Sequence, residues 1–592
     1  MIRPLKALER LLPRWLAEWA LSENAFLLVI GGALGVICGL LAVLFEWMAA
    51  TARSFFFLTP AGLLGTESLI YLFLVIPLMP AFGGLLVGAL TWFFKMGHES
   101  ASAAEVMKWA AVDSGVVRGK IIWFRLLTTS IFLGSGGSGG REGPIAQVCG
   151  AMGSVFGQVL RLSTERLRLL VGCGAAAGIA AAFNAPIAGV IFTVELVLAD
   201  FNVISFLPIV ISSVMATTTK RMLTTGDPVF EGPSYALVSS WEIGLYAILG
   251  ILCGLAARSF YVAYFRAEDY FKHRVKAHPI LKPAIGGLVV GGIGAFFPQV
   301  FGGGYEVMNQ MLDGNMWWAL ALALIPLKII ATAVALGSGG AGGVFAPSLF
   351  IGCMTGGVFG YGVHFLWPGD TATAGAYAMV GIGAVMAAVA QAPLTNILMG
   401  YELTGNYLII LPIMTACIMS SFVMARYTGE SLYTEKLRRR GIQLWRGRDL
   451  TVMDKIRVRE VMARDIATIP ESLPFGRIME LIASSRQSYF PVLDPAGKLS
   501  GVLSIQNVRE IMLHSAELRD LVVAKDIATA NVITLDESDN LNQAMEKFSM
   551  MDVEQLPVVL PDDPRAIVGM LSRMDVMSAY KKEVLKKAGT AP

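Results

Sequence analysis

Charged residues are scarce in this chain, and so are histidine and cysteine. Only 15% of the 592 residues are Asp, Glu, Lys or Arg, the formal net charge is +3, and there are 5 His and 6 Cys. A charge this close to zero argues against a nucleic-acid-binding surface. The cysteines form no Cys-x-x-Cys pair and have no His at ligand spacing, so we expect small buried hydrophobic residues, with no metal site and no disulfides.

Long apolar runs fill the first 430 or so residues. Hydrophobic residues make up 55% of the chain and the mean hydropathy is +0.62, which is too apolar for a soluble enzyme. The runs cover 25–48, 67–94, 121–133, 168–198, 203–218, 242–264, 281–297, 316–336, 376–400 and 407–425. Several reach the roughly 20 residues needed to cross a bilayer, and others are shorter or broken by Gly and Pro. The sequence therefore predicts an all-α polytopic membrane domain.

Both flanks of the apolar part are basic. Residues 1–24 place Arg and Lys among leucines and tryptophans, which predicts an amphipathic segment and not a cleaved secretory signal. Residues 439–456 form a second basic stretch. Because Lys and Arg are enriched on the cytoplasmic side of membranes, we expect both segments in the cytoplasm. With no targeting segment evident, a prokaryotic plasma (inner) membrane is the favoured location.

A Gly-rich segment occurs twice within the apolar part. Residues 133–144 read LGSGGSGGREGP, and residues 336–347, which lie 203 positions later, read LGSGGAGGVFAP. Both also match the dinucleotide fingerprint GxGxxG. That fingerprint requires a preceding strand in a soluble βαβ unit and an acidic residue about 20 positions on, and neither copy has them. Dinucleotide binding is therefore not favoured.

A second repeated block follows at nearly the same offset. GAAAGIAAAFNAP ends at Pro186 and GIGAVMAAVAQAP ends at Pro393, 207 positions later, and each leads through an apolar stretch to a Glu-Leu pair. Two matched blocks predict two structural halves, about 25–235 and 236–438. Such halves in transporters commonly have opposite orientations and place broken helix ends near the middle of the membrane.

The Gly-rich segments suit an anion. Four free N–H groups and about half a positive charge collect at a helix N-terminus. Glycines remove the Cβ atoms that would block an ion, and Pro in the first turn costs nothing because its N–H would be unpaired. The copies differ at Arg141-Glu142 and Val344-Phe345, where we expect the chemistry of the site.

The chain becomes polar after about residue 450 and contains another repeat. TIPES at 468–472 corresponds to TLDES at 534–538, with an offset of 66. Each copy has a helix-periodic stretch, at 476–484 or 541–549, followed by two short β-branched stretches around a turn. The sequence predicts a soluble α/β module.

Together these motifs resemble known families. Residues 25–438 resemble the membrane domain of the CLC chloride channel and transporter family. The resemblance rests on the motifs Gly140-Arg141-Glu142-Gly143-Pro144, Gly342-Gly343-Val344-Phe345-Ala346-Pro347, Asn184-Ala185-Pro186, Gln391-Ala392-Pro393 and Leu432-Tyr433. Residues 457–522 and 523–592 resemble a tandem pair of cytoplasmic CBS domains. The resemblance implies a homodimer in the lipid bilayer that transports chloride or another small anion, with one pathway per subunit.

The resemblance also implies roles for single residues. Glu142 corresponds to the external gate, which occupies the anion site when charged and leaves it when protonated. The residues implied to bind the anion are Gly140, Arg141, Gly143, Val344, Phe345 and Tyr433. For Arg141, a buried pairing with a carboxylate such as Glu105 is an alternative. Glu195 and Glu402 occupy equivalent places in the two halves, so we expect a structural role for each.

Two departures from the family pattern affect mechanism. Leu196 stands where proton-coupled members carry an inner glutamate that relays protons, and leucine cannot carry a proton. At the inner anion contact, where the family has a Gly-Ser-Gly-Ile-Pro-Glu stretch, alignment on Glu105 places Ala101, and a shift of one residue would place Ser100 or Ser102. We therefore favour a passive chloride channel gated by protonation of Glu142, with a proton–chloride antiporter as the alternative.

The CBS resemblance raises an adenine nucleotide as a possible ligand, although transport itself requires no cofactor. The family's Gly-x-x-Ser/Thr-x-x-Asp stretch is complete in the second repeat, with Ser572 and Asp575. In the first repeat Ser504 is followed by Asn507 in place of Asp. The serines would otherwise cap the following helices. A membrane-anchored nucleotide sensor and a CBS-regulated cation transporter are the alternatives from other classes, and the few separated intramembrane acids argue against the second.

Overall fold

The structure of this protein is a computed structural model. It describes residues 23–60, 75–96, 102–199, 203–224, 230, 237–442, 453, 456–485, 487–505, 507–508, 522–530, 532–551 and 553–587. The chain divides into two compact units, Met1–Leu444 and Trp445–Pro592.

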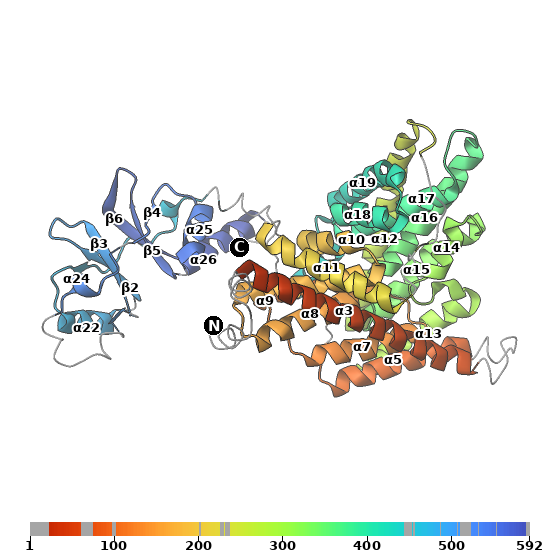
Figure 1. Ribbon diagram of the computed structural model, residues 1–592, viewed down its shortest axis with the longest axis horizontal. Coiled ribbons are helices and arrows are strands. Elements are labelled where there is room, and N and C mark those ends of the chain that lie inside the picture. The colour runs from red at the N-terminus through yellow and green to blue at the C-terminus, as the bar shows by residue number, and fades with distance from the viewer. Residues whose placement is uncertain are drawn as a thin grey trace, which may run out of the picture. The chain divides into compact units, whose positions relative to one another are not determined.

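The first unit consists of two series of helices (Figure 1). The first series is α3 (Glu23–Arg53), η1 (Ser54–Leu58), α5 (Ile76–Phe93), α6 (Ala103–Ala111), α7 (Lys120–Gly134), α8 (Glu142–Val159), α9 (Thr164–Phe183), α10 (Pro186–Phe192), η3 (Thr193–Leu198) and α11 (Val203–Leu223). The second is α12 (Glu242–His273), α13 (Leu281–Phe296), η4 (Pro298–Val300), α14 (Tyr305–Leu312), α15 (Trp318–Gly337), α16 (Phe345–Leu366), α17 (Ala374–Ala390), α18 (Pro393–Thr404), η5 (Tyr407–Ile409), α19 (Ile410–Thr428) and α20 (Leu432–Arg438). The packing repeats too, since α3 lies against α11 as α12 lies against α19.

Among the described residues, seven helices have the length and apolar composition needed to cross a bilayer. These are Ala25–Phe57, Ile76–Phe93, Thr164–Phe183, Glu242–His273, Trp318–Gly337, Phe345–Leu366 and Tyr407–Arg438. Shorter apolar helices cover Pro186–Leu198, Leu281–Phe296 and Ala374–Ala390. The predicted combination of long and broken helices is confirmed.

The breaks occur at equivalent places in the two halves. The helix α9 ends where Asn184 adopts a left-handed conformation with φ of 59°, and α10 begins at Pro186. The helix α17 ends in the same way at Gln391, with φ of 53°, and α18 begins at Pro393. A left-handed residue ends a helix, and Pro is well suited to start the next because it needs no partner for an N–H.

A two-fold relation between α5 and α13 joins the halves. A Cβ on Gly84 would lie 2.2 Å from the carbonyl oxygen of Pro283, and a Cβ on Gly287 would lie 2.1 Å from that of Pro80. Gly287 stands 203 positions after Gly84, and Pro283 stands 203 positions after Pro80, so each contact copies the other with the halves exchanged. Gly88, one turn after Gly84 in α5, approaches the carbonyl of Ile280, which comes before Pro283 in the sequence. The contacts therefore run in opposite directions along the two helices, which are antiparallel. The halves are therefore inverted, as the repeat predicts.

Glu195 and Glu402 each bind a broken helix of the opposite half. The Glu195 carboxylate accepts hydrogen bonds from two N–H groups in the first turn of α18, at 3.1 and 2.7 Å. The Glu402 carboxylate accepts two from the first turn of α10, at 2.9 and 2.7 Å. A carboxylate there satisfies free amides and interacts favourably with the helix dipole. These contacts support the structural role expected for both residues.

The second unit contains two repeats of strands and helices. In chain order its elements are η6 (Val458–Glu460), β1 (Ile469–Pro470), α22 (Phe475–Ser484), β2 (Tyr489–Leu493), β3 (Leu499–Ser504), α24 (Ala524–Ile527), β4 (Leu535–Asp536), α25 (Leu541–Met551), β5 (Gln555–Leu560), β6 (Asp563–Ser572) and α26 (Arg573–Lys587). They form two sheets of order β1-β2-β3 and β4-β5-β6, each with one parallel and one antiparallel pair. The predicted α/β repeat is confirmed.

Short segments are exchanged between these repeats. Val458, which precedes the first sheet, lies in the apolar core with Leu535 of the second repeat. Ile527, which precedes the second sheet, lies in the core with Ile469 of the first. Each repeat therefore depends on a segment from the other for a complete core.

Candidate functional site

The two Gly-rich turns meet inside the first unit. The N–H of Gly140 donates to the carbonyl of Gly343 at 2.7 Å, and the N–H of Gly343 donates to the carbonyl of Gly140 at 2.8 Å. A Cβ on Gly140 would lie 2.8 Å from the amide nitrogen of Ala346, so the turns approach this closely because they lack side chains. The pairing brings the N-termini of α8 and α16 together.

Glu142 is the first residue of α8 and is fully buried. Its Oε1 accepts a hydrogen bond from the hydroxyl of Tyr305, at the start of α14. Its Oε2 accepts one from the N–H of Ala346 in the first turn of α16, at 3.3 Å. The carboxylate therefore lies at the helix N-terminus where an anion is expected to bind.

Phe345, the first residue of α16, packs its ring against two other buried phenylalanines. The Phe345 ring centroid lies 5.1 Å from that of Phe183 and 6.4 Å from that of Phe192. All three side chains are buried, as are Gly140, Gly143 and Val344. The predicted residues of both repeat copies are thus brought together around the Glu142 carboxylate.

Arg141 pairs with a different carboxylate from the one suggested by the sequence. Its Nη1 lies 3.0 Å from Glu46 Oε1 on α3, and its Nε lies 3.9 Å from Glu142 Oε1. Glu46 also pairs with Lys220 at 2.7 Å. Glu105 pairs instead with Arg440, beyond α20, because α6 packs against α20. The suggested pairing with Glu105 is therefore wrong, while the expectation of a carboxylate partner holds.

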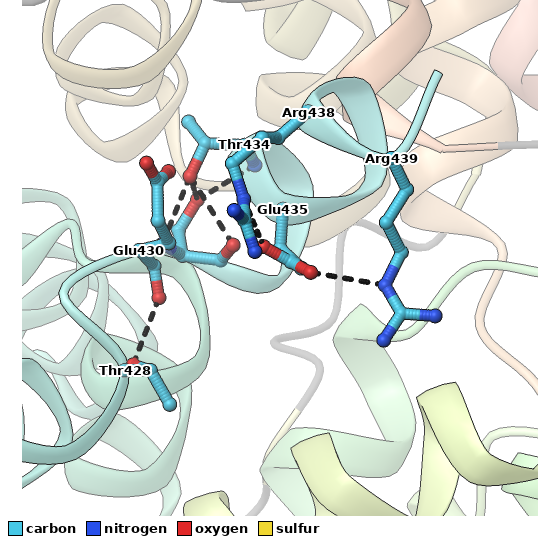
Figure 2. A network of polar contacts seen from close by, with 7 residues as sticks. Thr428, Glu430, Thr434, Glu435, Arg438 and Arg439 are labelled. Carbon is cyan, nitrogen blue, oxygen red and sulfur yellow. Dashed lines mark hydrogen bonds and ion pairs between the residues drawn. The ribbon is translucent and has the colours of Figure 1, made fainter. Parts of the chain in front are cut away.

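Tyr433 is buried in the first turn of α20. A capping box at Ser431 starts this helix. Figure 2 shows the other end, where Glu435 forms ion pairs with Arg438 at 2.7 Å and Arg439 at 2.9 Å. These contacts fix the helix that carries Tyr433, whose role as an anion donor stays a prediction.

The structure describes Leu196 but only part of the predicted inner anion contact. Leu196 is buried in η3, while the neighbouring Glu195 carboxylate binds the start of α18. Ser102 is buried at the N-cap of α6, whereas Ser100 and Ala101 lie outside the described residues. The inner anion contact therefore stays a prediction.

A cavity of about 890 Å³ is lined in part by Arg141 and Tyr305, which both contact Glu142. Its charged and aromatic lining includes Glu46, Arg53, Arg141, Phe301, Tyr305 and Glu306. Arg53 of α3 and Glu306 of α14 form an ion pair of 3.0 Å. The cavity thus reaches the side chains that contact Glu142.

The sequence reasoning missed three contacts of this site. The sequence could have indicated Ala346, because it is one of the first residues of a helix that the Gly-rich repeat predicts. Tyr305 stands 203 positions after Ser102, so the repeat offset carried a signal for it. Glu46 has no motif around it, and nothing in the sequence connects it with Arg141.

The residues proposed for the nucleotide site cap helices in the second unit. The N–H of Ser572 donates to Asp575 Oδ2 at 3.1 Å, and the N–H of Asp575 donates to Ser572 Oγ at 3.1 Å. Ser504 and Asn507 make the same reciprocal contacts at 3.0 and 3.3 Å. The capping role expected as the alternative is thus present in both repeats.

The six cysteines are free and buried, as expected from their apolar surroundings. Across the part of the chain that the structure describes, no cluster of three or more His, Cys, Asp or Glu side chains is arranged to hold a metal ion.

Comparison with known proteins identifies a family for each part of the chain. Residues 83–425 match the family described as Voltage gated chloride channel, and residues 458–514 and 524–582 match the CBS domain. A chloride channel protein of Ralstonia nicotianae, described as ClcB-like, is 39% identical over 61% of this chain and 85% of its own length. The H(+)/Cl(-) exchange transporter ClcA of Vibrio parahaemolyticus is 35% identical over 54% of this chain and 70% of its own length.

Solved structures show the same fold. The crystal structure of a slow cyanobacterial Cl-/H+ antiporter superposes with a TM-score of 0.65 at 26% identity, covering 70% of this chain and 97% of that one. The family match, the inverted halves and the paired Gly-rich turns all point to one assignment. The chain belongs to the voltage gated chloride channel (CLC) family of anion-transporting membrane proteins and carries a tandem pair of CBS domains after its membrane-spanning part.

Proposed function

We propose that this protein is a passive chloride channel whose pathway is opened by protonation of Glu142. The observation that carries the proposal is the position of the Glu142 carboxylate, which binds the Ala346 amide at the N-terminus of α16. A chloride ion would use the same amide, so the charged carboxylate and the ion exclude each other. Protonation removes the charge that holds the side chain there and frees the position.

Residues expected in the inner half of the pathway support a passive channel. Proton coupling needs a group that carries protons from the other side of the membrane, and the family position for it holds Leu196, which is buried and apolar. The adjacent Glu195 uses its carboxylate to bind the first turn of α18. Neither side chain is available as a relay.

A proton–chloride antiporter is the second candidate. It is favoured by the names of relatives, since the Vibrio parahaemolyticus protein is called an H(+)/Cl(-) exchange transporter and the cyanobacterial structure an antiporter. A movable carboxylate such as Glu142 would serve both mechanisms. The candidates differ only in whether chloride movement drives protons.

Purified protein in liposomes with a chloride gradient distinguishes them. For the channel we expect chloride flux with no uphill proton movement, measured with a pH electrode outside the vesicles. Uphill proton movement that disappears in Glu142→Gln would establish the antiporter. The Glu142→Gln variant is the matched control, because it keeps the size of the side chain and removes its charge.

We also propose a homodimer with cytoplasmic CBS domains, which regulate transport and are able to bind an adenine nucleotide at Ser572 and Asp575. The family membership supports the dimer and the orientation, and the complete Gly-x-x-Ser-x-x-Asp stretch supports the ligand. The basic segments on either side of the membrane part agree with this orientation.

A further inference from the structure

Tyr305 contacts the Glu142 carboxylate from outside the two Gly-rich turns. It is the first residue of α14, and its hydroxyl donates to Glu142 Oε1. The other carboxylate oxygen accepts from the N–H of Ala346. Donors from α14 and α16 therefore hold the two oxygens separately and fix the orientation of the carboxylate.

The same tyrosine lies between the carboxylate and the cavity. Tyr305 and Arg141 both line the cavity of about 890 Å³, whereas Glu142 is fully buried. The guanidinium carbon of Arg141 lies 5.4 Å from the Tyr305 ring centroid. Solvent in the cavity therefore meets these two side chains before it meets the carboxylate.

Hydrogen bonds from a buried lysine hold the backbone that leads into Tyr305. Lys328 of α15 is fully buried, and its Nζ donates to the carbonyls of Val300 at 2.9 Å and Gly302 at 2.8 Å. The N–H of Gly139 also donates to the Gly302 carbonyl, at 3.3 Å. These hydrogen bonds restrain the backbone that precedes Tyr305.

The internal repeat gives this arrangement an equivalent in the other half. Tyr305 stands 203 positions after Ser102, and Lys328 stands 203 positions after Arg125, which is also buried. Ser102 precedes α6 as Tyr305 begins α14. Each half thus has a hydroxyl residue at or just before the start of a short helix, and in the second half that hydroxyl binds Glu142.

We propose that Tyr305 is a positioning residue of the gate, whose hydroxyl holds the ionised carboxylate of Glu142 in the closed position. The inference rests on the proposed gating function of Glu142. A hydroxyl donor stabilises a carboxylate more than the protonated acid, so it sets the pH at which the gate opens.

Other charged and titratable groups also face Glu142. Arg141 lies beside it, with Nε 3.9 Å from Oε1, and the buried Tyr433 of α20 belongs to the predicted anion site. Glu46 of α3 and Lys220 of α11 act on it through Arg141. Tyr305→Phe keeps the ring that the Arg141 guanidinium packs against, so the variant removes only the hydroxyl.

The test measures chloride efflux from liposomes containing the full-length protein as a function of pH. In Tyr305→Phe we expect the pH of half-maximal flux to rise by about one to two units, as loss of a hydrogen bond to a charged group implies. Tyr361→Phe is the matched control. It loses a hydroxyl contact of 2.6 Å to the Met316 carbonyl, away from Glu142, and should leave the profile unchanged.

Two further variants make the outcome decisive. Replacing Tyr305 with 3-fluorotyrosine keeps its shape and strengthens the donor, so the half-maximal pH should fall. Adding Tyr305→Phe to Glu142→Gln should change the pH profile no further.

The outcomes separate the two proposals. An unmoved half-maximal pH in folded Tyr305→Phe, with pH dependence lost in Glu142→Gln, would overturn the role of Tyr305 and leave the gate intact. Retention of pH dependence in Glu142→Gln would overturn the gate itself. If Tyr305→Phe fails to fold, the fluorotyrosine protein decides, since an unmoved profile there also contradicts the proposal.

Discussion

A carboxylate buried among apolar helices needs donors to remain charged. At membrane depth an ionised side chain costs roughly 2.5–3.5 kcal/mol on insertion scales. Glu142 has the Tyr305 hydroxyl, the Ala346 amide and the N-terminal ends of two helices, each of which carries about half a positive charge. A chloride ion would be stabilised by the same groups. In the proposed mechanism, the side chain and the ion therefore compete for one position.

The Glu142→Ala variant tests this competition. Removing the carboxylate leaves the helix ends free for chloride, so we expect high anion efflux from liposomes that no longer varies with pH. Glu165→Ala is the control, because Glu165 is exposed in the first turn of α9 and should keep the parent's pH dependence. Efflux through Glu142→Ala that still falls as the pH rises would contradict the gate.

How much of the site could be predicted depended on whether a residue belongs to a repeated motif. Glu142 and Phe345 were predicted because they replace each other in two copies of one segment. The partner of Arg141 was not, because Glu46 lies 95 positions earlier on another helix, and only the folded chain brings the two together. Long-range pairs between single charges leave no periodic signal in a sequence.

At the scale of helices, the inverted repeat determines which surfaces touch. The glycines of α5 and α13 let the two backbones approach until a Cβ would overlap a carbonyl oxygen, and the contacts repeat with the halves exchanged. The Asn-Ala-Pro and Gln-Ala-Pro breaks place α10 and α18 so that Glu402 and Glu195 cap each other's helices. The sequence predicted the equivalence of these glutamates, but their partners required the fold.

Two glycines of one helix provide a matched test of that packing. A Cβ on Gly287 would lie 2.1 Å from the Pro80 carbonyl oxygen, whereas one on Gly292 would meet nothing within 4 Å. Gly287→Ala should therefore destabilise the protein by about 1–3 kcal/mol through overpacking. Gly292→Ala should be neutral or stabilise it by up to about 1 kcal/mol through helix propensity.

The measurement is the midpoint of thermal unfolding in detergent, followed by size-exclusion chromatography. A fall for Gly287→Ala alone is the expected result. Equal behaviour of the two variants would mean that α5 and α13 pack less closely than this contact implies.

At the scale of the whole molecule, the chain consists of two units with separate cores. The composition change near residue 450 predicted this division, and the boundary lies between Leu444 and Trp445. The exchange of segments between the CBS repeats could not be predicted, because a repeat shows which residues are equivalent and not which copy they pack against. Among the described residues, the hydrogen-bond and ion-pair partners of Glu142 belong to the first unit.

Ion pairs within the first unit hold its C-terminal end in place. Arg439 pairs with Asp269 of α12 at 2.8 Å, and Arg440 pairs with Glu105 of α6. These ion pairs hold the chain after α20, the helix that carries Tyr433. The helix therefore keeps its support when residues after 444 are removed.

Deleting residues 445–592 tests whether chloride transport requires the second unit. Because the gate and its contacts remain, we expect chloride efflux to persist with the pH dependence of the parent. Added ATP should alter efflux in the full chain only, and Asp575→Ala should weaken that effect without changing efflux in the absence of ATP. If the deleted chain elutes as a folded species but carries no chloride, transport depends on the tail. The proposal that the tail only regulates transport would then be wrong.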